Sequence, residues 1–189
     1  MEKLPKSPFP PGLAPFLDNP IRRLLINRER FLRGMGVKGG QSVLEVGCGP
    51  GFFTETLSRI VGQQGKVYAQ DVEEAMIRRV KKKLPSLPFT NVTLLLCAST
   101  ALELPGLSFD VVLCLNVLEE IYKEGGLTGT VKEIDRVLKT GGAVVIKEHR
   151  FGNTAPIVRE AEGLFEKNGY EKVSEKRGLL SYQSRLLKR

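Results

Sequence analysis

The sequence predicts an α/β fold: an open, mostly parallel sheet with an antiparallel C-terminal strand and helices on both faces. Three observations carry this prediction. Continuous apolar runs alternate with segments of helical periodicity from residue 42 onward, as in parallel sheets covered on both sides. A glycine-rich turn joins the first apolar run to a helix, and the chain ends in two strand-like segments linked at Gly178. Together these features indicate a Rossmann-like architecture.

The individual elements follow from local patterns. A short apolar or alternating run indicates a strand, whereas apolar residues three and four positions apart indicate a helix. Asn168 and Gly169 end the last predicted helix through a left-handed cap. We expect strands at 42–46, 66–70, 92–97, 110–115, 143–148, 171–177 and 181–187, and helices at 53–61, 73–84, 128–138 and 154–168.

The N-terminal part has a different composition. Residues 1–17 are rich in proline, which favours an extended arm. Asp18-Asn19-Pro20 has the pattern of a helix start, and this helix is expected to reach about Gly34. We therefore expect an arm and a lid-like helix in residues 1–36, followed by one compact ligand-binding domain in residues 37–189.

The turn after the first strand is the part of the chain most informative about function. Gly47, Gly49 and Gly51 alternate there, so the backbone can turn sharply and approach a ligand. The helix that follows presents free N–H groups to a polar or anionic ligand end. Asp71, after the second strand, is placed to accept hydrogen bonds from a ribose diol. The combination predicts a cofactor that contains adenosine.

Spacing distinguishes between adenosine cofactors. A dinucleotide fingerprint reads G-x-G-x-x-G around a pyrophosphate, whereas the glycines here fall at every second position. Glu45 precedes them and would repel a pyrophosphate but attract a ligand that carries a sulfonium and an amino group. The predicted cofactor is S-adenosyl-L-methionine. The glycine turn alone leaves a nicotinamide-dependent dehydrogenase as the runner-up.

The chain also resembles a known family, the class I S-adenosylmethionine-dependent methyltransferases, in the small-molecule branch that includes the ubiquinone and menaquinone biosynthesis enzymes. The resemblance runs from about residue 37 to residue 147. It rests on residues 44–51 (the first motif), Asp71 (the ribose-binding acid), residues 108–112 with 115–118 (the fourth-strand motif) and residues 138–142 (the turn before the fifth strand). It implies methyl transfer to a small-molecule acceptor.

The matching positions imply a set of cofactor contacts. Glu45 and the turn residues, with Cys48 among them, are expected at the methionine half, and Asp71 at the ribose. Val72 is expected to flank the adenine, with a core position as the alternative. The family usually has an acid near the end of the third strand for the adenine amino group. This chain has Ser99 and Thr100 there, so a hydroxyl or a backbone group is expected to make that contact.

Catalytic candidates are harder to assign, because methyl transfer from a sulfonium depends mainly on alignment and exclusion of water. Asn116, at the end of the fourth strand, is the best candidate for a polar contact facing the methyl group. His149, the only histidine, follows the fifth strand and could act as a base. Glu120, beside Glu119, lies where the family often has histidine. Each candidate has an alternative role. Asn116 could only cap a helix, His149 could be an incidental loop residue, and Glu120 could lie at the start of a solvated helix.

Composition limits the partners. The formal charge of +8 raises a nucleic-acid hypothesis, but no aromatic-interleaved basic motif supports it. We expect a small, anionic methyl acceptor, with nucleic acid not favoured. Basic residues near both ends of the chain are expected to guide that acceptor: Arg22, Arg23, Arg28, Arg30, Arg33, Arg185, Lys188 and Arg189.

The cysteine content and the hydropathy of the chain indicate where in the cell the protein is expected. Three cysteines without a C-x-x-C pair favour packing roles in a reducing environment and predict no metal site. A soft metalloid acceptor near Cys48, Cys97 and Cys114 is a subsidiary hypothesis. No apolar run approaches the roughly 18 residues of a membrane span, and the N-terminus lacks a secretory pattern. We expect a cytoplasmic protein with no membrane span.

Two other functions fit the same fold. One is methyl transfer to RNA or protein, which the basic charge favours. The other is binding of S-adenosylmethionine or S-adenosylhomocysteine without catalysis, which the departures from the family pattern at residues 97–101 and 119–120 favour.

Overall fold

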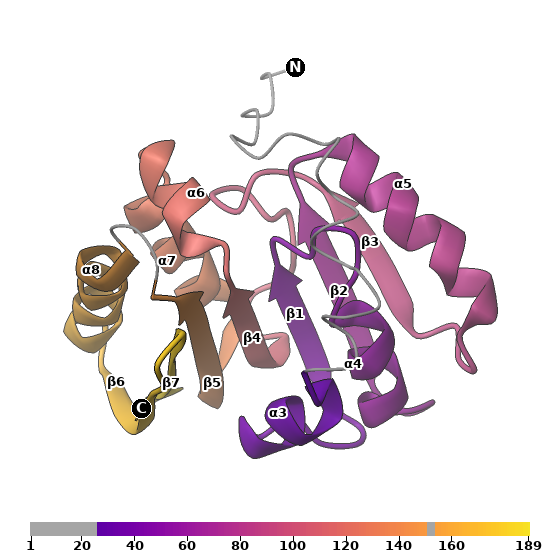
Figure 1. Ribbon diagram of the computed structural model, residues 1–189, viewed down its shortest axis with the longest axis horizontal. Coiled ribbons are helices and arrows are strands. Elements are labelled where there is room, and N and C mark those ends of the chain that lie inside the picture. Colours follow the sequence, from indigo (N-terminus) through magenta and orange to yellow (C-terminus); the bar gives the residue numbers. More distant parts are fainter. Residues whose placement is uncertain (1–25, 151–153) are drawn as a thin grey trace. The chain divides into compact units, whose positions relative to one another are not determined.

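The computed structural model describes residues 26–150 and 154–189 of the chain. By their internal contacts these residues divide into two compact units, one ending at Cys97 and the other beginning at Ala98. Each unit has its own set of strands and packed helices, labelled in Figure 1.

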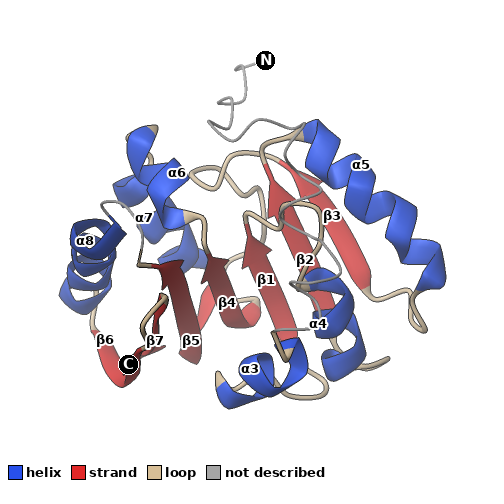
Figure 2. Ribbon diagram, in the orientation of Figure 1, coloured by secondary structure: helices blue, strands red, loops and turns tan. Residues whose placement is uncertain are grey.

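The first unit alternates helix and strand. Its three strands are all parallel, in the order β3-β2-β1. Helix α4 packs against β1 and β2, and α5 packs against β2 and β3 (Figure 2). The elements are α3 (Arg28–Gly34), β1 (Ser42–Val46), α4 (Thr54–Val61), β2 (Lys66–Asp71), α5 (Glu74–Lys83), the 3-10 helix η2 (Leu84–Ser86) and β3 (Val92–Leu96).

The second unit contains four strands in the order β4-β5-β7-β6. Strands β4 and β5 are parallel, whereas β7 runs antiparallel to both of its neighbours, β5 and β6. Helix α8 packs against β5 and β6. The elements are β4 (Phe109–Leu115), α6 (Leu118–Lys123), α7 (Leu127–Val137), β5 (Leu138–His149), α8 (Thr154–Lys167), β6 (Tyr170–Arg177) and β7 (Ser181–Lys188).

Strands such as β4 and β5 have continuous apolar sequences because their side chains are buried on both faces of the sheet. In β4, Val111 to Leu113 are almost fully buried, and the same holds for Val144 to Ile146 in β5. Strands buried on both faces have no solvent side that would favour alternating polar residues. The predicted strands and the four helices after residue 42 are confirmed with shifts of a few residues at most, apart from β5. Gly169 ends α8 with φ of +84°, which confirms the left-handed cap.

Three predictions about the elements were wrong or incomplete. The helix ending at Gly34 begins at Arg28, because the Asn27 side chain caps it by accepting from the Arg30 N–H at 2.8 Å. The predicted start at residues 18–20 lies outside the described residues. Strand β5 begins at Leu138 rather than at residue 143, because Leu138 already pairs with Phe109 of β4, and the register between the two strands is irregular over residues 139–142. Helix α6 was not among the expected helices, because six residues are too few to show a helical period; it confirms the alternative of a helix start at Glu119 and Glu120.

The first unit is tightly packed around Gly65, the residue just before β2. A Cβ at this position would lie 2.5 Å from Val61 Cβ and 2.7 Å from the Gln41 carbonyl oxygen. We expect Gly65→Ala to lower the free energy of unfolding by about 3 kcal/mol, since backbone atoms must move to accommodate the methyl group. Urea unfolding of both proteins measures this loss.

The matched control is Gly163→Ala, in the interior of α8, where an added Cβ meets nothing within 4 Å. That variant should gain about 1 kcal/mol, because alanine favours a helix more than glycine does. Equal stability of the two variants would contradict the packing described for Gly65.

Candidate functional site

The turn between β1 and α4 has a backbone that glycine is needed to adopt. Gly47, Gly49 and Gly51 have φ of +67°, +53° and +84°, a region that other residues rarely enter. A Cβ on Gly51 would also come within 3.1 Å of Val80 Cγ2, so α5 packs closely against the turn. A Cβ on Gly49 would meet nothing within 4 Å, which leaves the backbone there open to a ligand. The predicted sharp turn is confirmed.

The carboxylate of Asp71 holds this turn in place. Its Oδ2 accepts a hydrogen bond from the Gly49 N–H at 2.8 Å, and its Oδ1 accepts one from the Glu73 N–H at 2.9 Å. Asp71 is buried, and burial raises its pKa, with the two backbone hydrogen bonds acting in the opposite direction. Each carboxylate oxygen has a second lone pair. The acid therefore ties the turn to the start of α5 and keeps acceptor capacity for a ligand hydroxyl.

Gln70 supplies a second link that the sequence reasoning missed. Its Oε1 accepts from the Gly47 N–H at 3.2 Å, and its Nε2 donates to the Cys97 carbonyl oxygen at 2.5 Å. The side chain thus joins the turn after β1 to the end of β3. The available signal in the sequence was an amide within an apolar strand, since a buried amide needs hydrogen-bond partners.

Glu45 is a buried acid two residues before the turn. It is 2% exposed, and its Oε2 accepts a hydrogen bond from the Thr54 hydroxyl at 2.6 Å. Burial raises the pKa of Glu45 to about 8, and the nearby Asp71 charge adds to this shift. A ligand cation beside this carboxyl would offset the cost of its ionisation.

Cys48 lies in the turn, but its side chain faces the interior. It packs with Ala69 and Val80 in a buried cluster, and burial raises its pKa well above the usual thiol range. Cys114 in β4 is also buried, and burial raises its pKa to about 12. No group of three or more His, Cys, Asp or Glu residues that could hold a metal ion occurs within residues 26–150 and 154–189. Packing is thus the role that the structure shows for these two thiols.

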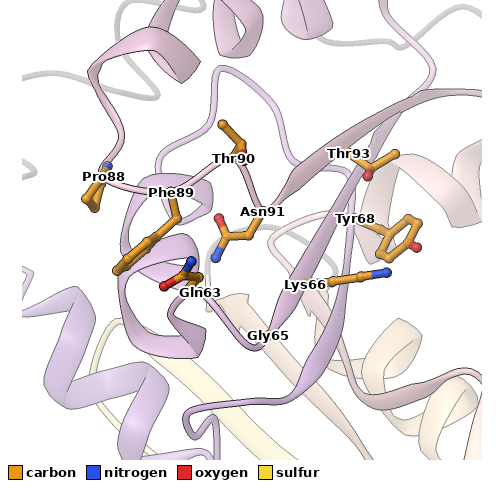
Figure 3. A pocket seen from close by; sticks show the side chains of 9 residues that line it. All are labelled: Gln63, Gly65, Lys66, Tyr68, Pro88, Phe89, Thr90, Asn91 and Thr93. Atoms are coloured by element: carbon orange, nitrogen blue, oxygen red, sulfur yellow. The ribbon is translucent and has the colours of Figure 1, made fainter.

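A cavity of about 450 Å³ lies at the amino ends of β2 and β3, and its lining residues are shown in Figure 3. Lys66, which lines it, is the first residue of β2, whereas Asp71 is the last. The cavity is therefore separate from the glycine turn. Its lining consists of Gln63, Gly65, Lys66, Tyr68, Pro88, Phe89, Thr90, Asn91 and Thr93.

In the second unit, Asn116 occupies the turn between β4 and α6. Its φ is +58°, a left-handed conformation that asparagine tolerates better than most residues, and its N–H donates to the Lys147 carbonyl oxygen at 2.7 Å. The half-buried residue thus lies at the carboxyl ends of β4 and β5. This is the location expected from the sequence.

Glu148 organises this turn and was missed by the sequence reasoning. It is buried, and its Oε1 accepts from the N–H groups of Val117 and Leu118 at 2.8 and 2.9 Å. Its Oε2 has no hydrogen-bond partner among the described residues. Burial raises the pKa of Glu148 to about 7. An acid in an otherwise apolar strand was the signal for it.

His149 and Glu120 lie in the same neighbourhood. His149 Nε2 is 3.8 Å from Glu119 Oε2 on α6, and its Nδ1 is 3.7 Å from Glu148 Oε2. Burial raises the pKa of Glu120, while the charge of His149 acts to lower it. The structure therefore brings Asn116, Glu120 and His149 together at the carboxyl ends of β4 and β5. Their catalytic roles stay predictions.

The candidates for the adenine contact have structural partners. Ser99 Oγ hydrogen-bonds Thr130 Oγ1 at 2.7 Å on α7. The Thr100 methyl group packs so close to α7 that a Cβ on Gly129 would lie 2.8 Å from it. Both residues anchor the segment after β3, and their adenine contact stays a prediction. Val72, after β2, is half-buried, and its role also stays a prediction.

Several basic residues expected to guide an acceptor are engaged within the protein. Arg28 Nη1 donates to the Phe52 carbonyl oxygen at 2.8 Å. Lys188 Nζ lies 3.0 Å from Asp135 Oδ1, and Arg189 pairs with Glu171. Arg22 and Arg23 lie outside the described residues. These contacts assign structural roles to the three basic residues.

Residues 43–142 match the family described as a methyltransferase domain, and the chain belongs to that family. Among curated relatives, it is 36% identical over 141 residues to the demethylmenaquinone methyltransferase of Lactococcus lactis subsp. lactis (strain IL1403), covering 75% of this chain and 54% of the relative. With the demethylmenaquinone methyltransferase of Geobacillus stearothermophilus it shares 34% over 128 residues, covering 68% and 53%. The chain thus spans about half the length of these relatives.

A solved structure covers nearly the whole chain. The crystal structure of a SAM dependent methyltransferase from Aquifex aeolicus superimposes with a TM-score of 0.82 and 28% identity, over 95% of this chain and 98% of the other. The comparisons confirm the predicted fold class and the resemblance to class I methyltransferases of the menaquinone type. No helix within the described ranges is long and apolar enough to cross a membrane.

The raised pKa of Glu148 should make the stability of the folded protein depend on pH. Its pKa is about 7 in the folded protein, against 4.5 for the group in the unfolded chain, so the folded state binds the proton more tightly. The Glu148 contribution to stability therefore falls as pH rises from 4.5 to 7, by on the order of 3 kcal/mol. Glu148→Gln keeps an acceptor oxygen for the two N–H groups and removes the charge. We expect its stability relative to wild type to rise between pH 5 and pH 8 in urea unfolding.

The control is Glu166→Gln, which changes an exposed glutamate on α8 and should follow the pH dependence of wild type. Parallel curves for Glu148→Gln and wild type would contradict the assignment.

Proposed function

We propose that this protein is an S-adenosyl-L-methionine-dependent methyltransferase that transfers a methyl group to a small-molecule acceptor by in-line displacement. The observation that carries the proposal is the glycine turn held by Asp71, with a buried acid beside it. Membership of the methyltransferase-domain family and the names of the relatives support it.

The residues of the turn fit the proposed donor. The open space over Gly49 admits a ligand to the backbone, and Glu45 is a buried carboxyl that a cationic ligand would stabilise in its ionised form. Asp71 retains acceptor capacity for a ribose hydroxyl. Together they make a site with a cation partner and a sugar partner. When bound, the donor supplies an electrophilic methyl group on a positively charged sulfur.

Three residues at the carboxyl ends of β4 and β5 are the proposed acceptor-side residues. Glu148 fixes the start of α6 through two backbone N–H groups, which positions Asn116 and Glu120 relative to His149. We propose that Asn116 makes a polar contact near the transferred methyl group and that His149 or Glu120 takes a proton where the acceptor has one to lose. Alignment and exclusion of water carry the rest of the rate enhancement.

Two finer statements belong to this proposal. The acceptor is anionic, which the net charge of +8 supports. The protein acts in the cytoplasm, which is consistent with three free cysteines.

Isotope labelling of cell extract tests the activity. Extract incubated with the protein and donor carrying a labelled methyl group should yield a labelled small molecule by mass spectrometry. Label appearing instead in RNA, in an amount that falls steeply with salt, would favour a nucleic-acid substrate. Donor binding without labelling of any fraction would favour a non-catalytic binder.

Asp71 tests the donor site. Asp71→Asn keeps one acceptor oxygen and loses the other together with the charge. We expect donor affinity to fall about 10- to 100-fold in isothermal titration calorimetry, since hydrogen bonds to a charged group contribute about 1.5–3 kcal/mol each. Asp71→Ala should bind still more weakly and also unfold more easily, because the Gly49 and Glu73 N–H groups lose their partner.

Lys66→Ala, in the cavity at the other end of β2, serves as the control and should bind the donor like wild type. Unchanged donor affinity in Asp71→Asn would contradict the ribose assignment.

The raised pKa of Glu45 should make the affinity for the donor depend on pH. A cationic donor prefers the ionised carboxylate, whose pKa is about 8 in the free protein. Affinity should therefore rise with pH by up to about tenfold per unit below pH 8, with release of a proton, and level off above it. Calorimetric titrations from pH 6 to pH 9 measure the slope.

Glu45→Gln separates this effect from titration of the donor's own amino group, which is common to both proteins. The variant should show a flatter dependence than wild type. The same slope in both proteins would remove Glu45 from the donor site.

A further inference from the structure

The turn between β6 and β7 presents two leucines to solvent. Leu179 is 88% exposed and Leu180 is 59% exposed, in a protein that buries most of its large apolar side chains. They are adjacent in the sequence, so one turn carries two solvated apolar side chains. Single exposed apolar residues are normal on a protein surface, whereas two neighbouring ones on one turn are a candidate contact point.

This turn is braced rather than loose. The Gly178 N–H donates to the Ser181 carbonyl oxygen at 2.8 Å. From the chain after β5, the Arg150 N–H donates to the Leu180 carbonyl oxygen at 3.0 Å, and Arg150 Nη1 donates to the Gly178 carbonyl oxygen at 2.8 Å. These contacts use the backbone groups of the turn and leave the two leucine side chains in solvent.

Basic residues flank the turn that carries the leucines. Arg150, Lys176 and Arg177 are all exposed and lie on the turn or next to it. Two acids contact the hairpin: Glu175, which pairs with Arg177 and Lys172, and the buried Glu162, which pairs with Lys172. Lys and Arg near an apolar point provide attraction to anionic headgroups while the apolar side chains enter the boundary of the acyl region.

We propose that Leu179, Leu180 and the three basic residues form a docking surface for an anionic lipid bilayer, here called the hairpin tip. Ser181 pairs with His149 in the register of β5 and β7, so the hairpin tip adjoins the acceptor side of the second unit. Docking therefore brings that end of β5 to the membrane surface. The hairpin lies beside β5 in Figure 1.

A bilayer fits this surface better than a protein does. A stable protein interface buries about 800 Å² on each partner, with matched shape, and two leucine side chains fall well short of that. The neighbouring β6 is exposed and rich in charge, with Glu171, Lys172, Glu175, Lys176 and Arg177 along it. Charged edge strands discourage pairing with a second chain. A lipid surface needs no complementary shape.

Vesicle co-sedimentation with the full chain tests this proposal. Wild type should pellet with vesicles that contain phosphatidylglycerol and much less with vesicles of phosphatidylcholine alone, and added salt should weaken the binding. In the double variant Leu179→Ser/Leu180→Ser the affinity for these vesicles should fall at least about tenfold, because both apolar side chains are lost. Lys176→Gln should weaken binding by about fivefold.

Two control variants carry the same changes elsewhere in the second unit. Leu107→Ser alters a leucine that is also 59% exposed but precedes β4, at the amino end of the strands. Lys132→Gln alters an exposed lysine on α7. Both should bind vesicles like wild type, and urea unfolding verifies that all variants are folded.

Absence of binding by wild type, or equal loss in Leu107→Ser and the double leucine variant, would overturn the proposal. Self-association of wild type that the leucine changes abolish, without vesicle binding, would assign the surface to a second copy and overturn it as well. Vesicle binding requires no methyl transfer, so its failure leaves the proposed function standing, and loss of donor binding leaves the hairpin tip intact.

Discussion

The hydrogen bond from the Gly49 N–H to the Asp71 carboxylate is the interaction on which the candidate donor site depends. Three glycines with positive φ allow the turn after β1 but do not select one conformation of it. The buried acid at the end of the neighbouring strand makes that selection, because its second oxygen is held by the start of α5. One carboxylate thereby fixes the positions of a turn and a helix. Gln70 reinforces the same turn from the adjacent position.

The second unit uses the same device with different residues. Glu148, near the end of β5, accepts two N–H groups from the start of α6 and holds the turn that contains Asn116. In both units an acid at the carboxyl end of a parallel strand binds backbone donors of the segment that follows a neighbouring strand. Loops at this end of an open sheet carry ligand sites, and side chains that fix them keep the sites preorganised.

These buried acids also carry an electrostatic cost. The pKa of Glu45 is raised to about 8 and that of Glu148 to about 7, in each case chiefly by burial. Such groups are costly in a protein that has only to fold, since their ionised forms are poorly solvated. A site that binds a positively charged ligand offsets this cost, because the ligand adds a positive charge to that of the nearby Lys83. The raised pKa of Glu45 and its position beside the glycine turn therefore have a common explanation.

The sequence by itself determined the alternation of strands and helices, the glycine turn and the acids Glu45 and Asp71, because each is a local pattern of a few residues. It did not reveal α6, the irregular register of β5 over residues 139–142 or the start of α3 at Arg28. These depend on a short segment without a period, on strand pairing and on a helix cap, respectively. Only the tertiary structure decided that Gln70 and Glu148 hold the site loops and that Ser99 bonds Thr130. Those contacts join residues 23 to 31 positions apart, and strand register, which no local pattern specifies, brings them within hydrogen-bonding distance.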